Sequence, residues 1–376
     1  MNFSLEKRLS EGNLRTLRIT PAHLIDFTSN DYLGFARSEE LRTCIASQEV
    51  SDKFRINGST GSRLLSGNSS LAEELELFIA KFHKAESGLL FNSGYDANVG
   101  LFSCIAQRSD TILYDELSHA SVIDGIRLSY AHTFKFRHND LEHLEELLKK
   151  TKDIKYVAVE SVYSMDGDFS PLQTLAELCQ RYHANLIVDE AHATGVFSER
   201  GEGRVVELGL EKNIFARMHT FGKALGCHGA IVLGSESLKS HLINFSRPFI
   251  YSTALPCHSL SSIKCAYTFL ESHIEKMNEL KERIRFFRES VKNVREVHFS
   301  DRSGPIQNVI IPGNERVKKL ATELQEMGYG LRPILSPTVT TGSERLRICL
   351  HSFNTQEEMK GLVSAIETLA DKKNHK

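Results

Sequence analysis

Short apolar segments rich in β-branched residues alternate with segments of helical periodicity between about residues 70 and 255. The sequence predicts strands at residues 87–92, 111–114, 154–160 and 185–189, and helices at residues 71–84, 98–107, 141–150 and 172–182. A strand followed by a helix, repeated several times, is typical of a mostly parallel sheet with helices on both faces. The alternation therefore predicts an α/β fold.

The two ends of the chain differ from this middle region. After Pro256 a long helical stretch runs through residues 279–292, and strand-like segments follow at residues 297–300, 306–313 and 346–352, with one helix between them. We therefore predict an N-terminal arm, a large α/β domain, and a linking helix with a small α+β domain, over residues 1–45, 46–255 and 256–376. A length of 376 residues suits two or three compact units, at roughly 150 residues each.

Composition narrows the class of partner. The formal net charge is only −2, so no strong field attracts nucleic acid or an anionic membrane, and no apolar run reaches the roughly 18 residues of a membrane span. The N-terminus lacks the apolar core of a signal peptide, and the seven cysteines are scattered without C-x-x-C spacing. We expect a cytoplasmic protein with reduced thiols, no metal site and small-molecule substrates.

Polar residues follow the predicted strands at the points where each strand ends. In an open parallel sheet ligands bind beyond the carboxyl ends of the strands, so these residues are candidates for one shared site. They are Ser93, Gly94, Tyr95, Ser118, His119, the residues from Ser161 to Ser164, Asp189, His192, Gly222 and Lys223. Each of them alone could be an ordinary cap or turn residue, but the set as a whole predicts a site.

Three parts of this set have complementary chemistry. Gly94 lies before a helix predicted to begin near Asp96, where free backbone N–H groups attract an anion such as phosphate. Asp189 ends an apolar strand and needs a cationic partner there, for which a protonated ring nitrogen is suitable. Lys223 follows Gly222 and can act as an amine nucleophile once desolvated. A phosphate anchor, a ring partner and an amine together predict a pyridoxal 5'-phosphate site.

The sequence resembles the α-oxoamine synthase family of fold-type I pyridoxal-phosphate enzymes over essentially its whole length. The matching motifs, in chain order, are SNDYLG from Ser29, GSTGSRLLSGNSS from Gly58, FNSGYDAN from Phe91, LSHAS around His119, SVYSMDGDFSPL from Ser161, VDEAHATG from Val188, TFGKALG from Thr220, YSTALP from Tyr251, and RPILSPTV through ERLRI near the end. The resemblance implies a mostly parallel seven-stranded sheet flanked by helices.

The resemblance also implies a role for each matched residue. Lys223 would form the Schiff base, Asp189 would face the pyridinium nitrogen, and His119 would stack on the ring, although alone His119 could be a plain loop histidine. The remaining cofactor contacts implied are Gly94, Tyr95, Ser164, His192 and Thr220. On the substrate side the family positions are Arg15, Asn30, Thr338 and Arg347. For Arg347 the alternative is a surface ion pair with Glu344, and Arg15 could be a plain surface residue too.

Within the family, the SRLLSG portion of the loop at residues 58–67 favours members that condense L-alanine with a pimeloyl thioester in biotin biosynthesis. The thiol carrier could be coenzyme A or acyl carrier protein. Relatives that join glycine to an acetyl or a succinyl group, or serine to a palmitoyl group, are the alternatives. The family also implies a homodimer in which residues 58–67 and 251–253 complete the partner's site.

The segment Asp189-Glu190-Ala191-His192 spells a signature of nucleic-acid helicases as well. A helicase needs a phosphate loop of the form G-x-x-x-x-G-K-[ST]. Around Gly222 and Lys223 the upstream glycine is replaced by Arg217 and the final Ser/Thr by Ala224. The helicase alternative is therefore disfavoured.

Overall fold

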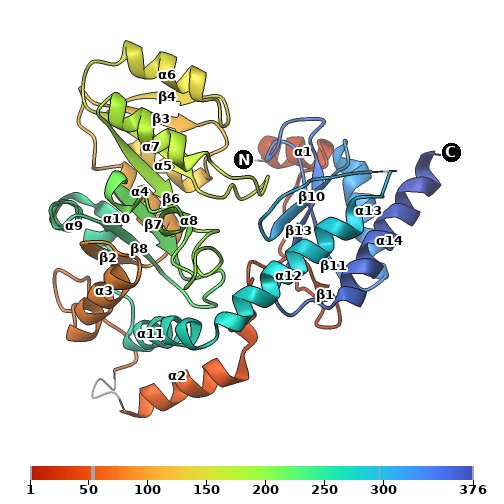
Figure 1. Cartoon of the computed structure of the whole chain (residues 1–376), viewed down its shortest axis with the longest axis horizontal. Coiled ribbons are helices and arrows are strands. Elements are labelled where there is room, and N and C mark those ends of the chain that lie inside the picture. The colour runs from red at the N-terminus through yellow and green to blue at the C-terminus, as the bar shows by residue number, and fades with distance from the viewer. Residues whose placement is uncertain (1, 52–55, 296, 375–376) are drawn as a thin grey trace. The chain divides into compact units, whose positions relative to one another are not determined.

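The structure is a computed structural model that describes residues 2–51, 56–295 and 297–374. It divides into two compact units, each built from separated stretches of chain (Figure 1). Unit 1 contains Met1–Tyr32, Ser164–Asp168 and Asn278–Lys376, and unit 2 contains Leu33–Tyr163 and Phe169–Met277. The domain boundaries predicted at residues 45 and 255 both fall inside unit 2 and stay a prediction about folding units.

Unit 2 is built on a seven-stranded sheet with the order β2-β8-β7-β6-β5-β3-β4. Its strands are β2 (Ser87–Phe91), β3 (Thr111–Asp115), β4 (His132–Phe136), β5 (Lys155–Glu160), β6 (Ala184–Asp189), β7 (Ala216–Thr220) and β8 (Ala230–Gly234). Strand β8 runs antiparallel to β2 and β7, and the other neighbouring pairs are parallel. The predicted mostly parallel α/β sheet is confirmed.

Helices cover both faces of this sheet. The helices of unit 2 are α2 (Glu39–Ser51), α3 (Ser70–Phe82), α4 (Gly94–Phe102), α5 (Ala120–Leu128), α6 (Leu141–Lys150), α7 (Leu172–Arg181), α8 (Arg204–Glu207), α9 (Glu236–Phe245), α10 (Arg247–Ile250) and α11 (Cys257–Ser272), with short 3-10 turns at Phe35–Arg37 and Glu211–Asn213. One buried cluster joins α4, α5 and α9 to the sheet, and a second joins α6, α7 and α8 to the opposite face.

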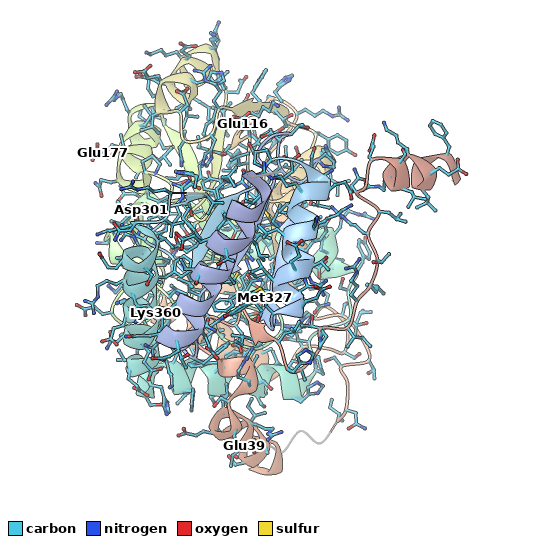
Figure 2. The ribbon with its side chains drawn as sticks, turned by 90° about the vertical axis from the view of Figure 1, so that its right-hand side faces the viewer. Glu39, Glu116, Glu177, Asp301, Met327 and Lys360 are labelled. Atoms are coloured by element: carbon cyan, nitrogen blue, oxygen red, sulfur yellow. The ribbon has the colours of Figure 1, made fainter. Side chains whose placement is uncertain are left out.

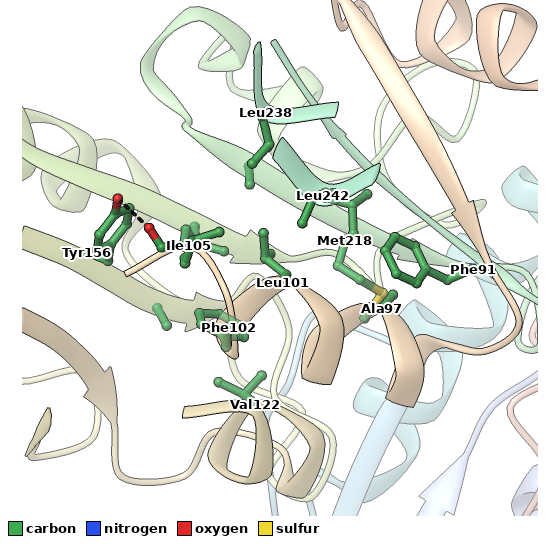
Figure 3. Close-up of a cluster of buried hydrophobic side chains, with 14 of the residues drawn as sticks. Phe91, Ala97, Leu101, Phe102, Ile105, Val122, Tyr156, Met218, Leu238 and Leu242 are labelled. Atoms are coloured by element: carbon green, nitrogen blue, oxygen red, sulfur yellow. Dashed lines mark hydrogen bonds between the residues drawn. The ribbon is translucent and has the colours of Figure 1, made fainter. Parts of the chain in front are cut away.

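The first cluster fixes the helices that carry the candidate site (Figure 3). Leu101 and Phe102 of α4 and Val122 of α5 are almost fully buried against strand residues such as Met218 of β7. The hydroxyl of Tyr156, the one polar group of this cluster's rings, donates to the carbonyl of Ile105 at 3.0 Å. Burial of this size stabilises a domain by roughly 1.5–3 kcal/mol per large apolar side chain.

Unit 1 combines a four-stranded antiparallel sheet with packed helices. The sheet order is β12-β13-β10-β9, and a separate parallel pair joins β1 to β11. These strands are β1 (Ile25–Asp26), β9 (His298–Phe299), β10 (Ile306–Ile310), β11 (Tyr329–Gly330), β12 (Arg332–Ile334) and β13 (Arg345–Cys349). The helices are α1 (Asn2–Ser10), α13 (Asn314–Glu326) and α14 (Gln356–Asn374), while α12 (Ile274–Val291) runs from one unit into the other. Helices α13 and α14 lie side by side in Figure 2, where Met327 and Lys360 mark them.

Several elements differ from the sequence-based expectation, and three of them lie in or beside the sheet of unit 2. Helix α4 begins at Gly94 and ends at Phe102, because the side chain of Ser93 caps it by accepting the N–H of Asp96. Strand β4 was not expected, since all but its last residue are exposed at the edge of the sheet. Glycine-rich turns surround the antiparallel strand β8, which was not expected either.

The described part of the chain contains neither a membrane-spanning helix nor a cluster of metal-ligating side chains. No helix there is long and apolar enough to cross a membrane. No group of three or more His, Cys, Asp or Glu side chains there is arranged to hold a metal ion.

Candidate active site

The N-terminus of α4 forms an open cradle beside the end of β7. A Cβ atom placed on Gly94 would lie 3.4 Å from both Cβ and Oγ1 of Thr220. The Thr220 hydroxyl donates to the carbonyl of Gly229 at 3.2 Å and lies 3.4 Å from the N–H of Gly222. Glycine at position 94 therefore leaves space next to a hydroxyl and to the unpaired N–H groups of a helix start, which favours an anion.

Asp189 is the last residue of β6 and is 7% exposed. Its Oδ1 accepts the backbone N–H of Ala191 at 2.8 Å, and its Oδ2 accepts the side-chain N–H of Asn98 at 2.8 Å. Each carboxylate oxygen accepts up to two hydrogen bonds, so capacity for a further donor remains. This donor pattern holds the carboxylate in a fixed plane at the strand end.

His119 caps the N-terminus of α5, and its electrostatic environment links it to two other predicted residues. Burial lowers its pKa, the carboxylate of Asp189 acts to raise it, and the ammonium of Lys223 acts to lower it. The net direction is downward, so a neutral imidazole is favoured at neutral pH. Hydrogen bonds through Ser121 and Asn98 link His119 to Asp189, and Lys223 is near enough for its charge to act on His119.

Three residues that sequence reasoning missed connect this group. The side-chain amide of Asn98 donates to Ser121 Oγ at 3.0 Å as well as to Asp189, and Ser121 Oγ lies 2.8 Å from His119 Nδ1. The carboxylate of Glu160, at the end of β5, accepts the backbone N–H of His119 at 2.6 Å. A fully buried polar residue inside an apolar helix, such as Asn98, was the signal that could have indicated this network.

The other residues of unit 2 that were predicted to contact the cofactor differ in exposure. His192 is 5% exposed in the turn that follows β6. Tyr95 is 48% exposed, and its hydroxyl donates to Asp124 Oδ2 at 2.6 Å. That hydrogen bond raises the pKa of Tyr95. Lys223 is partly buried in the loop after β7.

Glu190, the helicase-like neighbour of Asp189, has a structural task. Its Oε1 accepts the N–H of Val205 at 2.6 Å, while its Oε2 accepts the N–H of Arg204 at 3.1 Å and the hydroxyl of Ser161 at 2.8 Å. These bonds cap the start of α8 in a fully buried setting, and burial raises the pKa of Glu190. The carboxylate thus serves to hold the backbone and Ser161 in place within the fold.

Three predicted residues meet inside unit 1. The guanidinium of Arg347 donates from Nε to the carbonyl of Ser164 at 2.7 Å and from Nη2 to Asn30 Oδ1 at 3.0 Å. Glu344 instead accepts the backbone N–H groups of Gly313 and Gly342, each at 2.9 Å. The alternative of a surface Arg347–Glu344 ion pair is therefore wrong, because Arg347 lies beside Asn30 and Ser164.

Arg15 and Thr338 are the other two residues predicted to bind substrate. Both line a groove of about 730 Å³ in unit 1. Four other cations share its lining, namely Arg8, Arg18, Lys318 and Arg332, together with apolar residues such as Leu335. No carboxylate of the described residues pairs with Arg15 or lines this groove. The groove is therefore suited to an anionic ligand with an apolar stem.

The two segments implied in dimer contact lie together in unit 2. The N–H of Ala254 donates to the carbonyl of Gly61 at 3.0 Å, and Asn92 Nδ2 donates to the carbonyl of Thr253 at 2.9 Å. Leu65 and Tyr251 are exposed there, at 85% and 71%. The segments therefore adjoin the strand end that leads into Ser93 and Gly94.

Comparison with known proteins places the chain among characterised enzymes. The family model for aminotransferases of class I and II matches residues 22–366. The 8-amino-7-oxononanoate synthase of Emericella nidulans is 44% identical over 391 residues, covering 97% of this chain and 94% of that protein.

Two solved structures have the same fold. A serine palmitoyltransferase from Sphingomonas wittichii superposes with a TM-score of 0.87 at 27% identity, covering 93% of this chain and 88% of that one. The 8-amino-7-oxononanoate synthase of Francisella tularensis superposes with a TM-score of 0.80 at 28% identity, covering 93% and 99%. The resemblance to α-oxoamine synthases is thereby confirmed, and the chain belongs to the aminotransferase class I and II family, among relatives named 8-amino-7-oxononanoate synthase.

Proposed function

We propose that this protein is a pyridoxal-phosphate-dependent acyltransferase that condenses L-alanine with a pimeloyl thioester to give 8-amino-7-oxononanoate and carbon dioxide, a step of biotin biosynthesis. The structural observation that carries this proposal is the proximity of His119, Asp189 and Lys223 at the carboxyl ends of parallel strands. The 44% identity to an 8-amino-7-oxononanoate synthase supports the choice of reaction.

The side chains of unit 2 fit the cofactor. The cradle between Gly94 and Thr220 would take the phosphate, Asp189 would hold the proton of the ring nitrogen, and the amine of Lys223 would anchor the aldehyde. His119 would cover one ring face, with Tyr95 and His192 as further contacts. When bound, pyridoxal phosphate supplies an electron sink for the negative charge that develops at the α-carbon of the amino acid.

Lys223 has two tasks in this proposal. Its Nζ would hold the aldehyde of the cofactor, and as a free amine it would act as the base that removes the α-proton of L-alanine. Asp189 keeps the ring nitrogen protonated, because a carboxylate at the end of a buried strand stabilises a neighbouring positive charge. His119, held by Ser121 and favoured in its neutral form, would cover one face of the cofactor ring.

The residues of unit 1 would select the substrates. The guanidinium of Arg347 donates to Ser164, Cys349 and Asn30, and an N–H that these bonds leave over could donate to a substrate carboxylate. Arg15 and Thr338 line the cationic groove and would meet the distal carboxylate of the pimeloyl chain. Which arginine takes which carboxylate is settled by the Arg347 and Arg15 variants described in the Discussion.

A homodimer with a shared site and a cytoplasmic location complete the proposal. The exposed Leu65 and Tyr251, close to Ser93 and Gly94, support a second copy covering this edge, and C2 dimers are the commonest oligomers. All seven cysteines are free, as is usual in a reducing compartment. Light scattering should give twice the chain mass of 42.3 kDa, and an active monomer would refute the shared site. Mixing two inactive variants, Lys223→Ala and Thr253→Ala, should restore part of the activity.

The second candidate is another α-oxoamine synthase, which the superposition with serine palmitoyltransferase favours. A substrate matrix separates the two. L-alanine, glycine and L-serine are each paired with pimeloyl, acetyl and palmitoyl thioesters, and products are identified by mass spectrometry. We expect turnover mainly with L-alanine and the pimeloyl thioester, supplied on coenzyme A and on acyl carrier protein in separate arms. Turnover confined to glycine or serine would contradict the proposed reaction.

A further inference from the structure

One buried amide connects two residues of the proposed cofactor site. Asn98, on α4, is 1% exposed, and both N–H bonds of its side chain are used, one for Asp189 Oδ2 at 2.8 Å and one for Ser121 Oγ at 3.0 Å. Turned the other way, the amide would place its oxygen against the carboxylate of Asp189, and two acceptors would then face each other. The carboxylate therefore fixes the orientation of the Asn98 amide.

The hydrogen-bond directions continue from Asn98 to the imidazole of His119. The backbone N–H of Ser121 can only donate, and it points at His119 Nδ1 from 3.2 Å. Because that N–H makes Nδ1 an acceptor, the Ser121 hydroxyl, whose oxygen is 2.8 Å from Nδ1, donates to it as well, while the same oxygen accepts from Asn98. A nitrogen that accepts two hydrogen bonds carries no proton, and the proton of the neutral ring is therefore on Nε2.

We infer that Asn98 and Ser121 are positioning residues that hold His119 as its Nε2–H tautomer and, through the same amide, fix the carboxylate plane of Asp189. The catalytic meaning of this inference rests on the proposed function, because the cofactor would lie between the imidazole of His119 and the carboxylate of Asp189. Burial lowers the pKa of His119 and so favours the neutral ring that this tautomer requires. The Nε2–H is then the donor that His119 can offer to a substrate or cofactor atom.

The packing of the two helices makes this contact possible. Gly125 lies one turn after Ser121 on α5, and a Cβ there would come within 2.8 Å of the backbone oxygen of Asn98. The absence of that Cβ lets α5 approach α4 closely enough for a hydroxyl and an amide to meet. Glu160 holds the other side of His119 by accepting its backbone N–H.

The tautomer is measured directly by NMR on full-length protein labelled with ¹⁵N in its histidine rings, with and without pyridoxal phosphate. His119→Gln identifies the His119 signals. The wild-type ring should carry its proton on Nε2 in both forms. Ser121→Ala keeps the backbone N–H that donates to Nδ1 but loses the hydroxyl, so part of the ring population should move its proton to Nδ1, whereas Ser121→Thr, which keeps the hydroxyl, should retain the wild-type signal. A wild-type proton on Nδ1, or identical spectra for Ser121→Ala and wild type, would overturn the inference.

Cofactor affinity provides the second measurement. Asn98→Ala removes a hydrogen bond to a charged group and should weaken pyridoxal phosphate binding by about tenfold or more. Leu101→Ala on the same helix removes buried apolar contacts without touching the network, and it should lower stability more than affinity. Equal affinity losses in the two variants would count against the positioning role. If the wild-type protein takes up no cofactor, the proposed function fails, while the tautomer measured without cofactor still decides the inference.

Discussion

The two units place their proposed functional residues in different ways. In unit 2, Asp189 ends a strand and His119 and Lys223 follow strands of the same sheet, so the sheet itself brings them together. In unit 1, Asn30, Ser164 and Arg347 come from three distant stretches of chain and meet through hydrogen bonds to one guanidinium. Position in a repeating pattern predicts the first kind of site, whereas the second kind depends on tertiary packing.

The two units also differ in how their charged side chains are paired. The carboxylate of Asp189 is buried and already has two donors, so unit 2 presents a rigid, prepared site. The groove around Arg15 in unit 1 is lined by several cations and lacks a carboxylate partner for Arg15 among the described residues. We expect substitutions in unit 2 to abolish chemistry and substitutions in unit 1 to change which substrate binds.

The largest effect should follow Asp189→Asn. Without the negative charge the ring nitrogen can lose its proton, and α-proton exchange of L-alanine should slow by roughly a hundredfold or more. Exchange is followed by NMR in deuterated water. Asp115→Asn is the matched control, because Asp115 is also buried at a strand end but pairs with His138. Wild-type exchange rates in Asp189→Asn would refute its role.

Arg347→Ala should act on binding instead. If Arg347 holds the pimeloyl carboxylate, the KM for the thioester should rise by about tenfold, the loss of one charge-assisted interaction, while the spectral titration with L-alanine stays unchanged. Thioesters that end in a carboxylate should also lose their advantage over uncharged chains of equal length. A collapse of L-alanine binding would instead assign Arg347 to the amino acid, and Arg15→Ala should then show the thioester effect.

A smaller effect should follow Gly125→Ala in unit 2. The new Cβ would lie 2.8 Å from the backbone oxygen of Asn98 and 3.0 Å from Cβ of Phe102, so α5 has to shift, at a cost of about 1–3 kcal/mol of stability. Cofactor affinity should fall with it, because His119 moves away from Asp189. In Gly361→Ala of unit 1, the Cβ meets only the hydroxyl end of Tyr329. An affinity loss as large in that control would refute the explanation.

The smallest expected effect is on the pH dependence of stability, which the buried histidines of the two units should change differently. Burial and the charge of Arg217 lower the pKa of His83 in unit 2 to about 3, whereas in unit 1 the carboxylate of Asp26 partly opposes the lowering of the His351 pKa. Between pH 6.5 and 3 the unfolded chain binds a proton at His83 that the folded chain does not, so stability falls as the pH falls. From pH 7 to pH 5.5 the loss is about 1.2 kcal/mol.

Urea unfolding at pH 7 and pH 5.5 measures that loss. In His83→Gln the difference between the two pH values should shrink by this amount, and exposed His258→Gln serves as the control. An unchanged difference in His83→Gln would show that His83 is protonated in the folded protein.

The sequence predicted the interior of unit 2 well because buried parallel strands are continuous apolar runs separated by amphipathic helices. The residues 141–150 coincide with α6, and β6 extends the predicted strand at 185–189 by one residue. The exposed strand β4 carries no such pattern, since its first four residues face solvent. The start of α4 was misplaced because capping by Ser93 outweighs the weak apolar periodicity of its first turn.

The candidate site was predictable only in part, because some of its residues meet only through tertiary packing. Asp189 and Lys223 were found from their place after strands, but Asn98 was hidden because its role depends on α5 packing onto α4 at Gly125. In unit 1, sequence spacing does not bring Ser164 to Arg347, and only the family resemblance suggested that both matter. The roles themselves stay predictions until the variants are measured.

The most direct test of the account is to locate the cofactor's attachment. Full-length protein loaded with pyridoxal phosphate is reduced with borohydride, which makes the carbon–nitrogen link to the lysine permanent, and the modified peptide is identified by mass spectrometry. The account predicts label on the peptide that contains Lys223, and no stable label in Lys223→Ala. Label on any other lysine, or a protein that stays colourless with excess cofactor, would contradict the proposed site in unit 2.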